Sequence, residues 1–276
     1  MASIDKDTTV CISLAARPSS FGSTLMNALF SELGMNWIYK PFAVQAPDLP
    51  RAIDAVRLFN IRGCGVSMPH KEAVMPLLDE VDAKAKAIGA VNTIVNDSGK
   101  LSGYNTDWVG ALNALQGFGP GASKRVLVYG AGGAARAVIV AAKEWGASEI
   151  MVCNRTDSKA QELARKFGCT HLPSSSLSSQ SADVFFNATP VGMAPHESEM
   201  PIDEASLSHF GAVADVVIRP LHSRLISSAE KAGLPCAPGW RMAMQQGLAQ
   251  FKLYTGREPP LPFATKTVRE LLARSP

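Results

Sequence analysis

The chain has 276 residues, which is enough for one large domain or two of ordinary size. Hydrophobic residues make up 46% of it and charged residues 18%, which excludes a disordered chain and indicates a soluble protein with a substantial core. The net charge of +3 is small and evenly spread, and no run approaches the roughly 18 apolar residues of a membrane span. We therefore expect neither a nucleic-acid partner nor a membrane-embedded segment.

The cysteines and histidines indicate the redox compartment and whether a metal site is expected. The five cysteines are scattered without a Cys-x-x-Cys pair, which favours reduced thiols in a cytosolic protein. Asp5 and Asp7 precede the first apolar run, which is not typical of a signal peptide. No histidines show a metal-ligand spacing, so we predict a cytoplasmic protein with no metal site.

The first part of the chain alternates short apolar runs with segments of helical periodicity. Pro69 suits the first turn of a helix containing Lys71, and Ser98–Gly99 is typical of a hairpin turn. Strands are predicted at Thr9–Ala15, Ile38–Val44, Arg62–Ser67, Ala87–Val95 and Leu101–Tyr104, and helices at Thr24–Leu33, from Pro47 to Phe59, after Pro69 and from Asn105 to Gly117.

The second part repeats a strand–helix order, which predicts a doubly wound parallel sheet. Its strands are predicted at Arg125–Tyr129, Glu149–Asn154, Ala182–Ala188 and Val213–Ile218, and its helices at Ala134–Trp145, Ser158–Phe167, Arg241–Tyr254 and Thr265–Ala273. We predict an α/β protein whose domains span residues 1–107 and 108–238, with C-terminal helices in 239–276 that return to the first domain.

A glycine-rich turn follows the first strand of this second part. The sequence Gly130-Ala131-Gly132-Gly133-Ala134-Ala135 separates an apolar run from a helical one. Backbone N–H groups in such a turn can approach a pyrophosphate closely, with the positive end of the helix dipole behind them. Ala replaces the usual third glycine, a position that needs only a small residue. The turn favours a dinucleotide site, although similar turns also simply join a strand to a helix.

The tip of the next predicted strand indicates which dinucleotide would bind. NAD sites carry an acidic residue about 20 positions beyond the glycines, where it binds the ribose hydroxyls. Here the tip reads Asn154-Arg155-Thr156, with Lys159 one helical turn later. Arg155 can grip a 2′-phosphate that a carboxylate would repel, so NADP is favoured over NAD. Alternatively, Arg155 and Lys159 are ordinary solvated residues at a helix start.

Three polar clusters stand out in the first part, and their residues carry a family resemblance. They read Ser67-Met68-Pro69-His70-Lys71, Gly89-Ala90-Val91-Asn92-Thr93 and Gly103-Tyr104-Asn105-Thr106-Asp107. Together with the glycine turn, Asn154-Arg155-Thr156, Asn187-Ala188-Thr189 and the C-terminal Gly239, Met242 and Gln246, they resemble the motifs of the shikimate dehydrogenase family in fixed order. The resemblance runs from about Val10 to about Gly256.

The resemblance implies roles for individual residues of a substrate domain and a Rossmann-type NADP domain. Lys71 and Asp107 would be the catalytic pair, a reading in keeping with the proton exchange that hydride transfer to or from a ring oxygen requires. By the same resemblance, the substrate would be bound by Ser20, Ser67, Asn92 and Gln246. NADP would be bound by Gly130, Ala131, Gly132, Gly133, Ala134, Asn154, Arg155, Thr156, Lys159, Thr189, Gly239 and Met242.

Each of these residues also has an ordinary structural interpretation. Lys71 could be a surface lysine, Asp107 a helix cap, Asn92 a buried turn residue and Gln246 a surface residue of a helix. His70 is interpreted as a supporting or surface residue. We expect a small hydroxy-acid partner and a monomer or homodimer.

The chain departs from the family pattern at four positions, and these are typical of the shikimate dehydrogenase-like subgroup. Gly22 and Ser23 replace a serine and a proline in the loop from Ser20 to Asn27, Gly65 replaces an asparagine, and Ile218 replaces a tyrosine. Weaker carboxylate binding would follow. The ring substrate is therefore open between shikimate, quinate and an aminated shikimate analogue. A non-catalytic NADP-binding or substrate-sensing protein is the alternative from another class.

Overall fold

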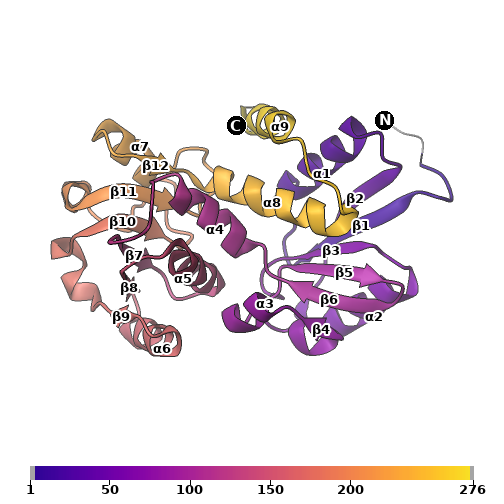
Figure 1. Cartoon of the computed structure of the whole chain (residues 1–276), viewed down its shortest axis with the longest axis horizontal. Helices are drawn as coiled ribbons and strands as arrows, with labels where there is room; N and C mark the ends of the chain where they lie inside the picture. The colour runs from indigo at the N-terminus through magenta and orange to yellow at the C-terminus, as the bar shows by residue number, and fades with distance from the viewer. Residues whose placement is uncertain (1–3, 274–276) are drawn as a thin grey trace. The chain divides into compact units, whose positions relative to one another are not determined.

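The strands form two six-stranded sheets, each the centre of a separate unit, in a computed structural model that describes residues 4–273 (Figure 1). Unit 1 comprises the residues up to Thr106 together with those from Gln246 onwards, and unit 2 is Asp107–Gln245. The two-unit α/β architecture predicted from the sequence is confirmed. No helix in the described part of the chain is long and apolar enough to cross a membrane.

The sheet of unit 1 is mixed, with strand order β2-β1-β3-β5-β6-β4. β1, β2 and β3 run parallel, whereas β5 is antiparallel to both of its neighbours. The strands are β1 (Thr9–Ala15), β2 (Trp37–Ala43), β3 (Gly63–Val66), β4 (Glu80–Val81), β5 (Thr93–Asp97) and β6 (Lys100–Tyr104). The helices are α1 (Phe21–Glu32), α2 (Leu49–Leu58), α3 (Ala83–Ile88) and α9 (Leu261–Ala273), with short 3₁₀ turns η1 (Ala46–Asp48) and η2 (Met75–Leu77).

The strands and the hairpin predicted in unit 1 are confirmed in place, but two local predictions are wrong. Residues 69–74 form consecutive turns and no helix, and Ala87 belongs to α3 instead of a strand. The Asp82 side chain accepts hydrogen bonds from the first N–H groups of α3, and Gly89, at φ +74°, ends the helix. Because these caps stabilise a helix up to Ile88, the strand begins later than the apolar run predicts.

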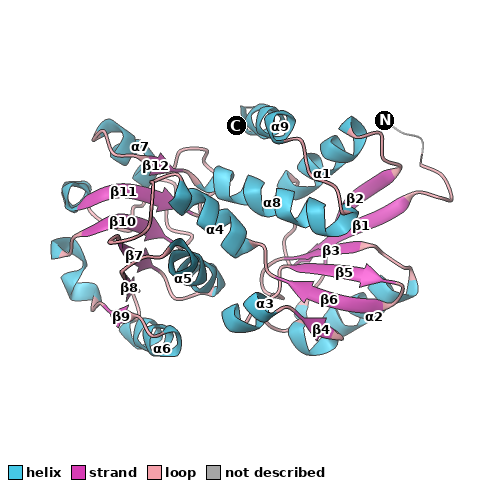
Figure 2. Cartoon of the chain, viewed as in Figure 1, coloured by secondary structure: helices cyan, strands magenta, loops and turns pink. Residues whose placement is uncertain are grey.

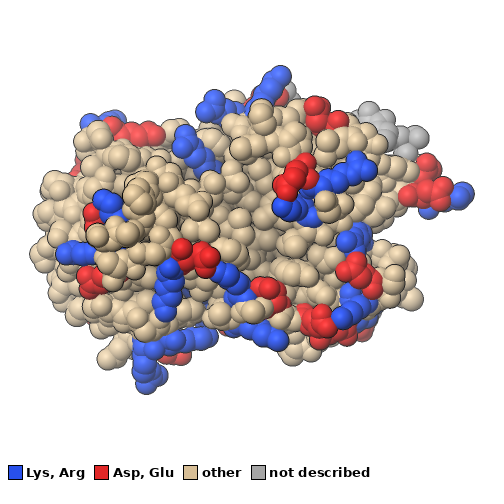
Figure 3. Space-filling model, viewed as in Figure 1, with Lys and Arg blue, Asp and Glu red and all other residues tan. Residues whose placement is uncertain are grey.

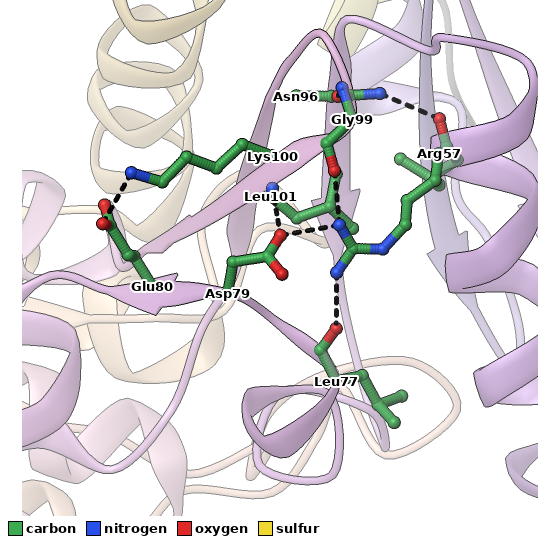
Figure 4. A network of polar contacts seen from close by, with 9 residues as sticks. Arg57, Leu77, Asp79, Glu80, Asn96, Gly99, Lys100 and Leu101 are labelled. Atoms are coloured by element: carbon green, nitrogen blue, oxygen red, sulfur yellow. Dashed lines mark hydrogen bonds and ion pairs between the residues drawn. The ribbon is translucent and has the colours of Figure 1, made fainter.

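A polar network fixes the edge of this sheet to the end of α2 (Figure 4). The Arg57 guanidinium donates to the Asp79 carboxylate at 2.6 Å and also bonds the carbonyls of Leu77 and Gly99. Asp79 in turn accepts the N–H of Leu101 at 2.7 Å, and its pairing with Arg57 holds its pKa below the usual range. Asp79, the residue before β4, is therefore fixed to the turn end of the β5–β6 hairpin.

The sheet of unit 2 is parallel throughout, with order β12-β11-β10-β7-β8-β9. Figure 2 shows helices on both sides of its strands. The strands are β7 (Arg125–Tyr129), β8 (Glu149–Cys153), β9 (Thr170–His171), β10 (Ala182–Asn187), β11 (Phe210–Asp215) and β12 (Cys236–Ala237). The helices are α4 (Asp107–Gln116), α5 (Gly133–Trp145), α6 (Asp157–Phe167), α7 (Arg224–Lys231) and the first part of α8 (Gly239–Thr255), with η3 (Ser174–Ser179) and η4 (Glu204–His209).

Burial on both faces explains the continuous apolar runs of these strands. In β7, Val126 and Val128 pack with α4, α5 and α6, whereas Leu127 packs with α7 on the other side. The order reversal between β7 and β10 leaves the carboxyl ends of both strands beside the glycine turn. The doubly wound sheet predicted from the strand–helix alternation is confirmed.

The C-terminal helices return to unit 1 from Gln246 and not from residue 239, because the first part of α8 belongs to unit 2. From Gln246 onwards α8 belongs to unit 1, where the Phe251 ring lies 5.6 Å from the Phe30 ring of α1. A Cβ at Gly247 would lie 3.0 Å from the Leu25 side chain, so α8 approaches α1 closely. α9 then packs against α1 (Figure 1).

Candidate functional site

The glycine turn joins β7 to α5 and leaves the start of that helix uncovered. Gly132 is the N-cap of α5 and supplies no side-chain hydrogen bond to the first helical N–H groups. A Cβ at Gly132 or Gly133 would meet no atom within 4 Å. Ala135 is fully buried, as the small residue expected where the helix contacts the sheet. Open space and uncapped N–H groups therefore fit a phosphate at this turn.

Gly130 holds the base of the turn against the loop after β10. At φ +131° it adopts a backbone conformation that favours glycine, and its N–H donates to the Cys153 carbonyl at 2.8 Å. A Cβ here would lie 2.9 Å from the Ala188 carbonyl oxygen and 3.0 Å from the Thr189 methyl group. The predicted cofactor residues Gly130 and Thr189 are thus brought together, and Ala131 and Ala134 pack partly buried on the core beside them.

The tip of β8 presents basic and neutral polar groups. Arg155, Thr156 and Lys159 are exposed, and the Asn154 amide donates to the Thr156 carbonyl at 3.1 Å. Asp157 follows at once, yet its carboxylate accepts the backbone N–H and the hydroxyl of Ser174 at 2.8 and 3.2 Å. The Asp157 carboxylate is therefore hydrogen-bonded to Ser174 of η3. The exposed groups at the tip of β8 are basic or neutral, so they suit a 2′-phosphate.

A buried polar network supports the loops that follow β10 and β11. The Asn187 amide donates to the Asp215 carboxylate at 3.0 Å, and the Asn187 carbonyl oxygen accepts the N–H and the hydroxyl of Thr189 at 3.1 and 2.6 Å. The same carboxylate accepts the Val217 N–H at 3.0 Å and the Ser223 hydroxyl. Burial raises the Asp215 pKa to about 6, although its hydrogen bonds oppose that shift.

Gly239 and Met242 begin α8 beside this network. A Cβ at Gly239 would lie 2.3 Å from the Val217 carbonyl oxygen, so only glycine lets the helix start this close. Met242 is buried in the core of unit 2, where its carbonyl approaches Gly110 of α4. Ile218, which the family pattern has as tyrosine, is half-buried one residue beyond Val217.

In unit 1, the three polar clusters converge on Asn92. Its side chain, 1% exposed, accepts the Thr106 N–H and the Thr93 hydroxyl, each at 2.7 Å, and donates to the Thr106 hydroxyl at 3.0 Å. The buried Asn92 side chain therefore has a structural role, because it ties Thr93 and Thr106 together. Asp107 directly follows Thr106, begins α4 as predicted and is 6% exposed.

Lys71 lies in a turn that is tied to the Asn92 loop. Its carbonyl accepts the Val91 N–H at 2.8 Å and so does not bond Met75, four residues on. The carbonyl of Glu72 would need a donor at Pro76, which has no N–H. These two interruptions explain why the predicted helix does not form. The turn is fixed beneath by His70, which is 1% exposed and donates through Nε2 to the Val44 carbonyl at 2.9 Å.

The other predicted substrate residues lie on three different elements of unit 1. Ser67 follows β3 with an exposed side chain, and its N–H donates to the Leu14 carbonyl at 2.9 Å. Ser20 is the exposed N-cap of α1, and its side chain makes no capping hydrogen bond. Gln246 is half-buried on α8.

Sequence reasoning missed Gln250, which is one helical turn beyond Gln246. Its amide donates to the Asn92 carbonyl at 3.2 Å and to the Thr93 hydroxyl at 3.0 Å, and only 7% of the residue is exposed. The four-residue spacing places both glutamines on one face of α8. This spacing could have indicated Gln250 from the sequence. A polar residue between apolar ones on a buried helix face is expected to be hydrogen-bonded.

Charges of both signs are interspersed on the face seen in Figure 3. Among residues 4–273, no group of three histidine, cysteine, aspartate or glutamate side chains is arranged to hold a metal ion.

Comparison with known proteins identifies similar chains over both units. The family model described as the shikimate dehydrogenase substrate binding domain matches residues 18–94, and the model described as shikimate / quinate 5-dehydrogenase matches residues 113–199. A shikimate dehydrogenase-like protein of Haemophilus influenzae is 40% identical over 258 residues, covering 93% of this chain and 94% of its own.

Two further relatives carry a cofactor in their names. The shikimate dehydrogenase (NADP(+)) of Methanothermobacter thermautotrophicus is 40% identical over 92% of this chain and 93% of its own length. The structure of shikimate 5-dehydrogenase from Thermus thermophilus in complex with NADP(H) and shikimate is 34% identical, with a TM-score of 0.87 over 95% of this chain and 99% of that one.

Proposed function

Because the chain belongs to the shikimate dehydrogenase family, as its motifs predict, we propose that it transfers a hydride between NADPH and 3-dehydroshikimate, giving shikimate reversibly. One observation carries the proposal. The turn of Lys71 is hydrogen-bonded to the loop of Asn92, and Asn92 is hydrogen-bonded to Thr106, the residue before Asp107. The named relatives with NADP and shikimate support the same substrate and cofactor.

The dinucleotide, when bound, supplies or accepts the hydride at its nicotinamide ring. The first turn of α5 would hold its pyrophosphate, and Arg155, with Asn154, Thr156 and Lys159, would hold the 2′-phosphate. Thr189, Gly239 and Met242 would border the rest of the cofactor. The uncapped helix start and the engaged Asp157 carboxylate support this assignment.

Lys71 and Asp107 are proposed to handle the proton. Reduction of the ring ketone leaves an oxygen that must gain a proton, and a lysine ammonium can donate it at that oxygen. Asp107 would orient the ammonium and accept a hydrogen bond from a neighbouring ring hydroxyl. Ser20, Ser67, Asn92 and Gln246 would bind the carboxylate and the remaining hydroxyls.

Relative turnover on three rings tests the substrate. We expect shikimate to give the highest kcat/KM with NADP⁺, above quinate and an aminated shikimate analogue, and NAD⁺ to be the poorer cofactor with each ring. A higher kcat/KM on quinate or the amino analogue would assign that ring as the substrate and leave the proposed hydride transfer unchanged. NADP binding with no turnover on any ring would favour the sensor alternative, against which the presence of both Lys71 and Asp107 argues.

A further inference from the structure

A buried carboxylate joins the loops at the carboxyl ends of β10 and β11. Asp215 ends β11, pairs with Asn187 at the end of β10, and is 1% exposed. Its Oδ1 accepts the Asn187 amide and the Val217 N–H, both at 3.0 Å, and its Oδ2 accepts the Ser223 hydroxyl. Ser223, the N-cap of α7, also accepts the Ile226 N–H. One side chain therefore connects two loops and a helix start.

The hydrogen bonds of Asn187 determine which way its amide faces. Its Nδ2 group donates to the Asp215 carboxylate and, at 3.3 Å, to the Val191 carbonyl. Because an ionised carboxylate and a carbonyl only accept, the Asn187 Oδ1 must face Thr189, whose N–H and hydroxyl it accepts. The Val191 N–H donates in turn to the Thr189 hydroxyl at 3.3 Å. Asp215 thus fixes the Thr189 side chain through a single intervening amide.

Three of the predicted cofactor residues lie in these loops or against them. Thr189 belongs to the network, and a Cβ at Gly130 would lie 3.0 Å from its methyl group. A Cβ built on Gly239 would overlap the carbonyl oxygen of Val217, whose N–H donates to Asp215. A shift of the Asp215 carboxylate would therefore disturb all three cofactor residues together.

The strand order assigns this network to one half of the dinucleotide. β7, with the glycine turn at its carboxyl end, lies between β8 and β10 (Figure 1). The exposed Arg155 and Lys159 follow β8 on one side, whereas Asn187 and Asp215 end β10 and β11 on the other. A dinucleotide with its pyrophosphate at the turn would therefore extend its adenosine half towards β8 and its nicotinamide half towards β10 and β11.

The hydrogen-bonding positions of Asp215 can be separated from its charge. Burial raises its pKa to about 6, so ionisation of this group at neutral pH costs stability. An asparagine here could accept the Asn187 and Val217 donors through its oxygen and donate to Ser223 through its amide. An alanine would instead leave the buried Asn187 amide without this acceptor.

We propose that Asp215 is a positioning residue for the nicotinamide half of NADP. It acts on Thr189 through the Asn187 amide, and on Gly239 through the backbone of Val217. The proposal rests on the proposed function, because it concerns the cofactor site of that reaction. The Asp215 carboxyl itself stays buried and sets the loops that form the contact surface.

Asp215→Ala tests the proposal, with Asp215→Asn as the conservative variant. We expect Asp215→Ala to raise the Kd for NADPH about tenfold, and Asp215→Asn to stay within about twofold of the wild type. The Kd for adenosine 2′,5′-bisphosphate, which occupies only the adenosine half, should change by less than about twofold in both variants. Titration calorimetry measures both constants, at a temperature where thermal unfolding shows each variant to be folded.

Asp183→Ala is the control at the opposite end of β10. The Asp183 carboxylate accepts the Arg125 N–H at 2.8 Å and the Lys124 ammonium at 3.1 Å, so its loss should also lower stability. Its Kd for NADPH should equal that of the wild type, because the loop of Thr189 follows the other end of the strand. Loss of stability in unit 2 is thereby separated from misplacement of the cofactor loops.

Asn187→Ala supplies a second variant that leaves Asp215 in place. It should show the same selective loss of NADPH affinity, and the double variant should bind NADPH within about twofold of Asp215→Ala. Losses that multiply in the double variant, a wild-type Kd for NADPH in Asp215→Ala, or an equal loss of adenosine 2′,5′-bisphosphate affinity would overturn the inference and leave the proposed function standing. Absence of NADPH binding by the wild type would overturn both.

Discussion

Asp215 is a residue whose charge state the fold controls. The carboxyl is 1% exposed, and burial raises its pKa to about 6 from an ordinary value of 3.8. The folded state therefore binds more protons than the unfolded state between these two pH values. The stability that the protonated group contributes is complete below about pH 4 and is lost as the pH rises through 6.

Asp215→Asn removes this titration while keeping an oxygen for the Asn187 and Val217 donors. We expect the free energy of unfolding of the wild type, relative to this variant, to fall by about 3 kcal/mol between pH 4 and pH 7. Urea unfolding at a series of pH values measures the difference.

Asp183→Asn is the control of opposite sign. The Arg125 N–H and Lys124 lower the Asp183 pKa, so the wild type should gain stability over that variant as the pH rises through the ordinary carboxyl range. Parallel profiles for the wild type and Asp215→Asn would show that Asp215 does not titrate in this window.

The proposed cofactor residues and catalytic pair could be nominated from the sequence because they stand in motifs that resemble those of a known family. Asp215 and Tyr39 could not, since their contacts depend on partners far away in the chain. Asp215 meets Asn187 and Ser223 only when β10, β11 and α7 are assembled. Tyr39 meets Gly65 only when β2, β1 and β3 are aligned.

At the scale of elements, some glycines of unit 2 allow close packing, whereas others, such as Gly132, have an open side-chain position. Gly239 and Gly130 permit close backbone approach, whereas a Cβ at Gly132 would have no neighbour within 4 Å. The backbone of Gly132 is extended, a conformation that alanine also adopts. Packing therefore does not require glycine at position 132, whereas the proposed phosphate would use this space.

Gly132→Ala should therefore separate binding from stability. We expect its free energy of unfolding to stay within about 0.5 kcal/mol of the wild type, while the Kd for NADP⁺ rises at least about tenfold. Thermal unfolding and fluorescence titration with NADPH measure the two effects. Gly239→Ala, which places a methyl group against the Val217 carbonyl, should lose stability as well; unchanged NADP affinity in Gly132→Ala would argue against a pyrophosphate at this turn.

Most strands and long helices followed from the sequence because burial on one or both faces imposes a regular apolar pattern. The wrong predictions lie where tertiary hydrogen bonds and helix caps outweigh the apolar pattern. The Lys71 carbonyl bonds Val91 in place of a helical partner, and α3 is set by the caps at Asp82 and Gly89. The strands β4, β9 and β12 have two residues each and so carry no periodicity from which to predict them. The eight-residue helix α7 is also absent from the sequence prediction.

At the scale of the whole molecule, the motifs that carry the family resemblance are divided between the two units. Unit 2 contains the glycine turn and the basic strand tip, and unit 1 contains the Lys71 turn and the Asn92 network. α8 carries Gly239 and Met242 in unit 2 and Gln246 in unit 1. The motifs are thus distributed over two cores, and none of them alone indicates the proposed reaction.

The central claim is that Lys71 donates the proton in an NADP-dependent reaction of a shikimate-type ring, and shikimate-dependent reduction of NADP⁺ by Lys71→Ala tests it most directly. We expect the wild type and Lys266→Ala, an exposed lysine of α9, to reduce NADP⁺ equally. Lys71→Ala should lose about 10²–10⁴-fold in kcat with an unchanged Kd for NADP⁺. Wild-type kcat in Lys71→Ala, or no shikimate-dependent reduction by the wild type from neutral to alkaline pH, would contradict the account.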